Sequence, residues 1–372
     1  MTAERTGTVV IGGGVIGLSI AFHLAEAGVA TVLLERDALG SGASKATADV
    51  VRAYFAGNVA SSALAVRSLA AYHAFPERPG FDLPLRQVGY LVLFTEPGQV
   101  ASFEADLPGQ RAAGVEVELI SPDEARRRNP LIGDDVPLLA AAWSPAAYVS
   151  DTAAIVKGYA EAARNAGAEL RTHCPVTAVD PAAGLVHTTD GPVRAEAIVC
   201  AAGAWSGDLA RSAGVRLPLT EPVVQELLTT GPLPRTPDIP VTLHAASGLL
   251  VRLRGDRLLI GMGYPDQERE LWRERVATQL AAVYPGLAGA ELHTAVTGVR
   301  DASPDRTAFL GRAPGAATFL YAAGFSGHGL CNAPAAGELI RDLCLGRDPE
   351  LGQDLGLDLA RLSATPERAG ER

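Results

Sequence analysis

The sequence predicts an α/β fold with two domains: a Rossmann-like dinucleotide-binding domain and an antiparallel α+β domain inserted into it. Three observations lead to this fold class. A strand, a glycine-rich turn, a helix and a second strand follow one another at residues 8–36. Buried strand-like segments return after residues 149 and 297. The segments between them alternate in polarity as antiparallel strands do.

The glycine-rich turn is the most specific motif of the chain. Residues 8–36 read TVVIGGGVIGLSIAFHLAEAGVATVLLER, in which an apolar strand precedes Gly12-x-Gly14-x-x-Gly17 and a helical pattern follows it. Gly12 permits the tight turn, Gly14 lets the backbone approach a pyrophosphate, and Gly17 lets the helix pack closely on the strand. The helix N-terminus offers unpaired N–H groups and a partial positive charge to the phosphates.

The second strand, residues 31–34, ends on Glu35. A carboxylate at that place accepts hydrogen bonds from two ribose hydroxyls. The ordered set of strand, glycines, helix, strand and acid therefore predicts a dinucleotide site. The alternative is a glycine-rich β-α-β crossover that binds no ligand. That alternative does not explain why strand, glycines, helix, strand and acid follow one another in this order.

Composition narrows the class of protein further. The 372 residues are 48% hydrophobic and 20% charged, enough for one large domain or two intertwined ones. The net charge of −10 disfavours a nucleic-acid partner. No apolar run reaches the ~18 residues of a membrane span, and the first strand starts too early for a signal peptide. The four cysteines lack metal-ligand spacing, so we expect reduced thiols, no metal site and a cytoplasmic location.

The changes of pattern along the chain predict the domain boundaries. We expect strands at residues 85–95, 115–120, 223–229, 248–253 and 257–263, and helices at residues 98–107 and 268–284. The dinucleotide-binding domain is predicted to comprise residues 1–84, 149–216 and 297–346, and the second domain residues 85–148 and 217–296. Residues 347–372 show no pattern and are expected to form a frayed C-terminal tail.

Four segments resemble the FAD-dependent D-amino-acid oxidase superfamily, nearer its sarcosine oxidase and glycine oxidase branch. They read VVIGGGVIGLSIAFHLAEAG…VLLER, GSGAS with Arg52 after it, AIVCAAGAWS, and GVRDASPDRTAFLG…LYAAGFSGHGLCNAPAAGELI. They extend from the first strand to the last helix, so the resemblance covers nearly the whole chain. It implies an FAD-binding domain of the glutathione-reductase type, with the second domain covering the substrate.

The resemblance also implies which residues hold a non-covalent FAD stretched across the sheet. The ADP half would lie against Gly12, Gly14, Val15, Ile16, Gly17, Glu35 and Arg36, the middle against Ser41, Ser44 and Lys45, and the adenine end against the backbone of Val176. The ribityl chain and isoalloxazine would lie along Ala202, Gly203, Trp205, Arg300, Gly324, Gly327, His328, Gly329 and Leu330. The helix N-terminus after His328 would stabilise negative charge on the reduced ring.

The chemistry that the resemblance implies is oxidation of a C–N bond in a small amino or imino acid, sarcosine-, glycine-, proline- or D-amino-acid-like. The flavin accepts a hydride and the product is an imine, so the protein need only orient the amine and hold its carboxylate. Arg52 and Arg300 are the carboxylate candidates, because a guanidinium matches a carboxylate in bidentate fashion. A surface salt bridge is the alternative for each. Lys45, Tyr264 and His328 complete the catalytic candidates.

The chain departs from the sarcosine oxidase pattern at three positions. The cysteine that binds flavin covalently in that branch falls at Gly298 here, and the substrate-binding lysine after the GHG turn falls at Cys331. The lysine that promotes reaction with oxygen falls near Gly261. Lys45 takes its place only if its side chain reaches the flavin. The electron acceptor, oxygen or a partner protein, therefore stays open.

Several side chains keep two interpretations. The His328 side chain either polarises the flavin edge or is structural, and Asp49 either pairs with a cationic substrate or Arg52 or acts as a cap. Tyr264 and His244 are candidates for the substrate pocket. The same fold also permits oxidation of a hydroxy acid or polyol phosphate, or a non-catalytic flavin-bound assembly role.

Overall fold

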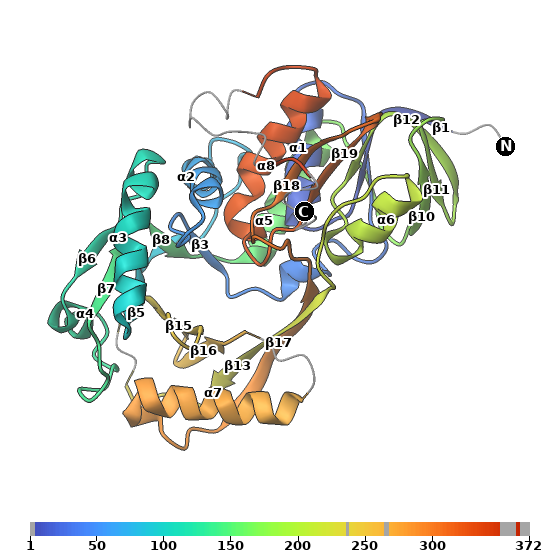
Figure 1. Cartoon of the computed structure of the whole chain (residues 1–372). Helices are drawn as coiled ribbons and strands as arrows, with labels where there is room; N and C mark the ends of the chain where they lie inside the picture. The colour runs from blue at the N-terminus through green and yellow to red at the C-terminus, as the bar shows by residue number, and fades with distance from the viewer. Residues whose placement is uncertain (1–3, 236–237, 264–267, 350–361, 365–372) are drawn as a thin grey trace.

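The computed structural model of the chain describes residues 4–235, 238–263, 268–349 and 362–364. Two units are visible in Figure 1, each built around its own eight-stranded sheet. A small three-stranded sheet of β3 (Val50–Arg52), β8 (Ala147–Val149) and β4 (Arg86–Gln87) lies between them. Segments from both predicted domains meet in this small sheet, so it connects the two units.

The first sheet has a parallel centre. Its order is β9 (Glu169–Arg171), β2 (Thr31–Leu34), β1 (Glu4–Ile11), β12 (Gly191–Cys200) and β19 (Ala316–Ala323). The strands β10 (Val176–Asp180) and β11 (Leu185–Thr188) add an antiparallel meander to β12, and β18 (Phe309–Ala313) pairs antiparallel with β19. Ile11 aligns with both Leu34 and Cys200, so the loops after β1, β2 and β12 start at one sheet edge.

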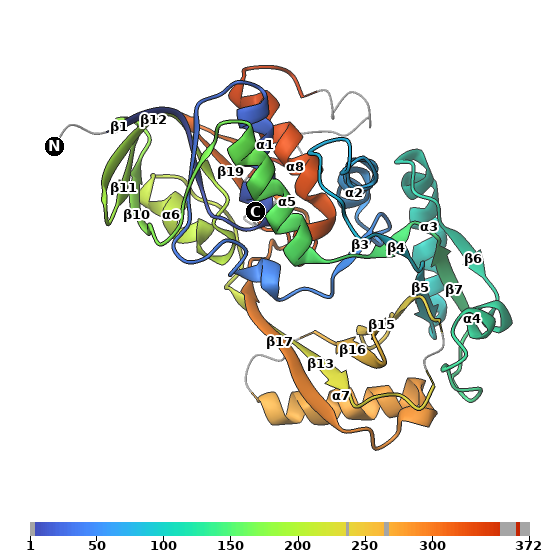
Figure 2. The same ribbon diagram turned by 180° about the vertical axis from the view of Figure 1, so that it is seen from behind.

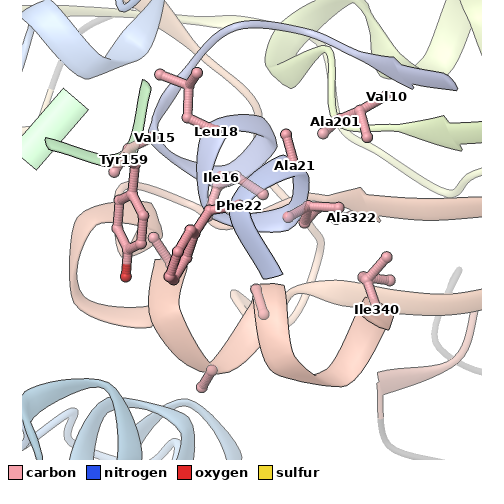
Figure 3. Packing of buried hydrophobic residues seen from close by; sticks show 14 of the residues in the cluster. Val10, Val15, Ile16, Leu18, Ala21, Phe22, Tyr159, Ala201, Ala322 and Ile340 are labelled. Carbon is pink, nitrogen blue, oxygen red and sulfur yellow. The ribbon is translucent and has the colours of Figure 1, made fainter. Parts of the chain in front are cut away.

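Three helices pack together on one face of this sheet: α1 (Val15–Glu26), α5 (Thr152–Asn165) and α8 (Gly329–Cys344). Figure 2 shows α5 beside α1. Every residue of α1 from Val15 to Ala25 is buried, because the helix touches the sheet and both other helices. In Figure 3, Phe22 lies beside Tyr159 of α5, and Ile16 and Ala21 lie among apolar side chains of the sheet and α8. This core holds the N-termini of α1 and α8 at the same sheet edge.

Other helices complete the first unit. α2 (Val59–His73) packs against α8, and α6 (Ser206–Ser212) packs against β10 and β12. Two short 3-10 turns, η1 (Ala43–Lys45) and η2 (Gly203–Trp205), lie in the loops after β2 and β12.

The second sheet is antiparallel except where β14 pairs with β5. Its order is β17 (Leu292–Arg300), β13 (Val223–Thr230), β16 (Arg257–Gly261), β15 (Leu249–Arg254), β14 (Val241–His244), β5 (Tyr90–Phe94), β7 (Ala140–Ser144) and β6 (Glu118–Ile120). The helices of this unit are α3 (Pro97–Ala112), α4 (Pro122–Arg128), α7 (Arg269–Val283) and the turn η3 (Pro285–Leu287). Trp272, Val276 and Leu280 of α7 are buried in the core of this sheet.

The structure confirms the predicted fold class, but some of its strands differ from the predicted ones. The strand predicted at residues 85–95 is two strands, β4 and β5, which belong to different sheets. Strand β14 was not predicted, because four residues, three of them buried, give too short a pattern. Strand β17 crosses the boundary predicted at residue 297 and remains in the second sheet up to Arg300.

The prediction of a frayed tail is wrong for residues 362–364. Leu362 is fully buried in the core of the first unit, and the Ala364 N–H donates to Tyr321 Oη at 3.0 Å. A single apolar side chain anchors this part of the tail, and one residue leaves no periodic signal in the sequence.

Candidate active site

A cavity of about 1300 Å³ lies along the carboxyl edge of the parallel strands, between the two units. The first unit supplies residues such as Gly12, Glu35 and His328, and the second sheet supplies Leu227 and Leu250. Drug-sized ligands occupy pockets of roughly 300–1,000 Å³, so this cavity has room for an extended ligand and a second small molecule. Its position outside the carboxyl ends of parallel strands is typical of nucleotide-binding α/β folds.

The first turn forms a cradle that only glycine allows. Gly12 has φ +112°, and a Cβ there would overlap the carbonyl oxygen of Ala201. A Cβ on Gly17 would overlap the carbonyl oxygen of Gly12. The N-cap of α1, Gly14, offers no side-chain cap, and Ser44 Oγ accepts from the Val15 N–H at 3.0 Å. The turn therefore presents a helix N-terminus that fits a phosphate.

Glu35 lines the cavity near the glycine-rich turn, and two hydrogen bonds fix its position. Its carboxylate accepts from the Gly13 N–H at 2.6 Å and from the Asp37 N–H at 2.8 Å. Each carboxylate oxygen has a further lone pair, so Glu35 retains the capacity to accept from ribose hydroxyls. The Arg36 guanidinium lies 4.2 Å from the centre of the Trp205 ring. Arg36 and Trp205, which both line the cavity, therefore lie against each other.

The middle of the cavity is lined by the loop after β2 and by the loop after β12. Ser41, Ser44, Lys45, Ala202 and Gly203 of these loops line the cavity, and so does Val176 of β10. Val176 lies at the start of β10, beside a β-bulge in its pairing with β11. The cysteine position of the covalent enzymes is filled tightly, because a Cβ on Gly298 would overlap Cβ of Ala46.

Arg300 ends β17 and lies against the turn that precedes α8. The position of a Cβ on Gly327 is 3.3 Å from Arg300 Nη1. The Nε atom of Arg300 is buried and has no hydrogen-bond partner among the described residues. Burial, and next the positive charge of Arg306, lower the pKa of Arg300. A buried donor without a partner requires an acceptor, and this one lines the cavity.

Arg52 approaches the same region from β3. Its guanidinium lies 3.9 Å from the centre of the Phe55 ring and 4.5 Å from the centre of the Tyr90 ring. One Nη donates to the Tyr54 carbonyl oxygen. Within the described residues, neither Arg52 nor Arg300 forms an ion pair with a carboxylate, so the salt-bridge alternative does not hold there for either.

His328 is the N-cap of α8 and stays neutral. Its ring lies 4.2 Å from the Phe55 ring, and its Nδ1 atom is buried without a partner among the described residues. Burial first, and then the charges of Arg52, Arg306 and Arg300, hold the pKa of His328 well below its usual value. The helix makes no side-chain capping bond, so its N-terminus remains available to an anionic group.

Asp301 shapes the turn before α8 and also lines the cavity. Its buried carboxylate accepts from the N–H groups of Gly324 and of Phe325, the latter at 3.3 Å. Burial raises the pKa of Asp301, and these two backbone bonds act in the opposite direction.

Two sequence-based candidates lie outside the cavity lining, and a third falls on residues that the structure does not describe. Asp49 pairs with Arg252 at 2.9 Å and accepts from Thr152 Oγ1 at 2.8 Å. Of its two interpretations, the structure does not bear out the pairing with Arg52. His244 does not line the cavity and instead contacts Ser247 Oγ at 2.8 Å. Tyr264 lies outside the described residues.

Cys331, which stands at the position of the substrate-binding lysine, is a cavity-lining residue and also a packing residue. It lines the cavity, and it packs in a buried cluster with its Sγ donating to the Val50 carbonyl oxygen at 3.4 Å. Burial raises the pKa of the Cys331 thiol, which keeps it protonated.

Sequence reasoning missed Arg306. It has φ +60°, is exposed and lines the cavity, and its charge lowers the pKa of both Arg300 and His328. The SPDRT segment that contains it was part of the resemblance, but only the fold shows that the following turn brings this side chain back to the cavity.

The fold and this cavity define a two-domain protein that binds an extended dinucleotide beside a second, small ligand. The chain belongs to the FAD dependent oxidoreductase (DAO) family, whose model matches residues 8–343. FAD is therefore its cofactor, and the glycine cradle, the helix N-termini whose N-cap residues make no side-chain capping bond, and the buried unpartnered polar atoms fit that group.

Known relatives share the whole fold. Glycine oxidase from Bacillus licheniformis is 29% identical over 364 residues, covering 92% of this chain and 94% of the relative. Mouse (Mus musculus) dimethylglycine dehydrogenase is 28% identical over 93% of this chain, which spans 43% of that relative's length. The crystal structure of L-proline dehydrogenase from P. horikoshii has a TM-score of 0.86 at 27% identity, covering 100% of both chains. The chain thus spans less than half of the mitochondrial dehydrogenases and nearly all of the glycine oxidase.

The described residues contain neither a candidate membrane span nor a candidate metal site. No helix among them combines the length and apolar character that crossing a membrane requires. Nor do three or more His, Cys, Asp or Glu side chains gather in the described ranges in a way that could hold a metal ion.

Proposed function

We propose that this protein oxidises the C–N bond of a small amino or imino acid. The observation that carries the proposal is the pair Arg52 and Arg300, two guanidinium groups at one end of the cavity without a carboxylate partner among the described residues. Glycine oxidases and dimethylglycine dehydrogenase among the relatives act on molecules with a nitrogen next to a carboxylate-bearing carbon. Such a substrate supplies the missing anion.

Each residue then has a separate task. The first turn and Glu35 hold the ADP half of FAD, and the N-terminus of α8 stabilises negative charge at the ring. Arg52 and Arg300 hold the substrate carboxylate, and the rings of Phe55 and Tyr90 fix Arg52 and exclude water around it. Bound FAD would supply the hydride acceptor for the carbon next to the nitrogen. The nitrogen lone pair would then form the C=N bond of an imine, which water hydrolyses.

We propose that FAD is held non-covalently in a domain of residues 1–84, 149–216 and 297–346, and that residues 85–148 and 217–296 cover the substrate. The tight contact between Gly298 and Ala46 supports non-covalent binding. Purified protein should be yellow, and acid precipitation should release free FAD into the supernatant. A precipitate that keeps its colour would contradict non-covalent binding.

The amine chemistry has its own test. Amino acids should bleach the flavin anaerobically, and hydroxy acids and polyol phosphates should not. Bleaching by a hydroxy acid alone would overturn the proposal. The electron acceptor is oxygen or a partner protein, and Lys45, which lines the cavity, is the lysine available to promote reaction with oxygen. Release of peroxide in air identifies the oxidase. We also propose a cytoplasmic location, supported by four cysteines that are all free thiols.

A further inference from the structure

Three arginines gather at one end of the cavity. Arg52, Arg300 and Arg306 all line it, and the charge of each one lowers the pKa of His328. They come from different elements: Arg52 from β3, Arg300 from the end of β17, and Arg306 from the turn between β17 and β18. The neutral His328 adds no charge, so this end of the cavity carries three positive charges.

Three carboxylates in this part of the structure bond to groups other than these arginines. Asp301 accepts from two backbone N–H groups, and Asp49 pairs with Arg252. Glu226, which also lines the cavity, pairs with Arg269 at 2.7 Å and with Arg273 at 2.9 Å. In the described part of the chain, therefore, no carboxylate forms an ion pair with any of the three arginines, although the charge of Asp301 raises the pKa of Arg300.

A single carboxylate does not satisfy this arrangement. It presents two oxygens, and the half-buried pair Arg52 and Arg300 is sufficient to bind them. Arg306 is more exposed than these two, and it would then face the cavity without an anion. Its positive charge would still destabilise the charged form of Arg300, whose pKa it lowers. Like charges gathered around one space are stabilised when the ligand brings a matching number of negative charges.

We propose that the substrate is an amino or imino dicarboxylic acid. Its carboxylate next to the reacting carbon binds Arg52 and Arg300, and its second carboxylate binds Arg306. This inference rests on the proposed function, because it names the substrate class of the same reaction. The oxidised bond and the hydride acceptor are unchanged; only the second anionic group is new.

The test compares matched pairs of compounds on the FAD-loaded protein. Anaerobic flavin reduction is followed with iminodiacetate against N-methylglycine, and with each enantiomer of aspartate against alanine. Binding without turnover is followed by the change in flavin absorbance with malonate and succinate against acetate and propionate. We expect the dicarboxylates to bind about tenfold or more tightly, since each charged hydrogen-bonded contact contributes at least that factor.

Substitutions locate the second contact. Arg306→Gln should weaken binding of the dicarboxylates about tenfold or more and leave the monocarboxylates unchanged, and Arg306→Lys should retain part of the effect. Arg275→Gln is the matched control, because Arg275 is exposed on α7, away from the cavity lining, and its loss changes the net charge equally.

The outcomes separate this inference from the proposed function. If amino acids bleach the flavin but Arg306→Gln affects both classes equally or neither, the dicarboxylate inference is wrong and the proposed function stands. If no amino acid bleaches the flavin while dicarboxylates still bind through Arg306, the function is wrong and the two-anion pocket stands. If dicarboxylates bind no better than monocarboxylates, the inference is overturned.

Discussion

Replacing Asp49 with asparagine should weaken the junction between the two units. Asp49 Oδ2 accepts from Arg252 Nη2 at 2.9 Å, and Oδ1 accepts from Thr152 Oγ1 at 2.8 Å. Arg252 belongs to the second sheet, and Thr152 begins α5 of the first unit. Asp49 has φ +54°, which asparagine also tolerates, so the substitution removes the charge without straining the backbone.

The magnitude follows from the burial of the partner. The Arg252 side chain is only 3% exposed, and burial lowers its pKa to about 10 although Asp49 opposes that shift. Removing one member of a buried pair costs about 3–5 kcal/mol, and we expect about 3 kcal/mol because asparagine still accepts a hydrogen bond. An unfolding entropy of about 2.1 cal/mol/K per residue then gives a fall of about 4 °C in the melting temperature.

The assay is urea and thermal unfolding of the FAD-loaded protein, followed by circular dichroism and by flavin fluorescence. Arg252→Met should couple to Asp49→Asn, so that the double variant is little less stable than either single one. Asp208→Asn is the control, because Asp208 lines the same cavity but pairs with Arg211 at the surface. If Asp49→Asn and Asp208→Asn melt at the same temperature, the ion pair does not stabilise the junction.

Three further predictions concern the cofactor cradle, the substrate and pH. Arg300→Ala should weaken substrate binding by about 1.5–3 kcal/mol with FAD content unchanged; unchanged affinity would remove Arg300 from the carboxylate site. Gly17→Ala should yield colourless protein, because a Cβ there overlaps the Gly12 carbonyl oxygen; a yellow variant would contradict the cradle. Burial lowers the pKa of His23 from 6.5 to about 4 in the folded protein. Between these two pH values the imidazole is protonated only in the unfolded chain. The free energy of unfolding should therefore fall by up to about 3 kcal/mol as the pH drops from 6.5 to 4. In pH-dependent urea unfolding, His23→Gln should flatten this slope and the exposed-site control His187→Gln should not.

Local motifs made the nucleotide end of the site predictable. Gly12, Gly17 and Glu35 lie within one short strand, turn, helix and strand unit, so their spacing in the sequence predicts that they are close together in the fold. The contacts that sequence reasoning missed join residues far apart in the chain. Asp49 meets Arg252 across 203 positions, and nothing in either segment specifies the other. Arg306 becomes a site residue only because the turn after β17 returns to the cavity.

The Asp49 bridge also bears on the chemistry, because it lies three residues before Arg52. Arg52 is supplied by the first unit, whereas Arg300 ends a strand of the second sheet, so the carboxylate site forms only where the two units meet. A guanidinium pair loses much of its bidentate geometry when one member moves by about 1 Å. Asp49→Asn should therefore raise the substrate Kd as well as lower stability, although Asp49 itself pairs with Arg252 and not with a ligand. A variant that loses stability but binds substrate normally would show that the positions of Arg52 and Arg300 do not depend on this bridge.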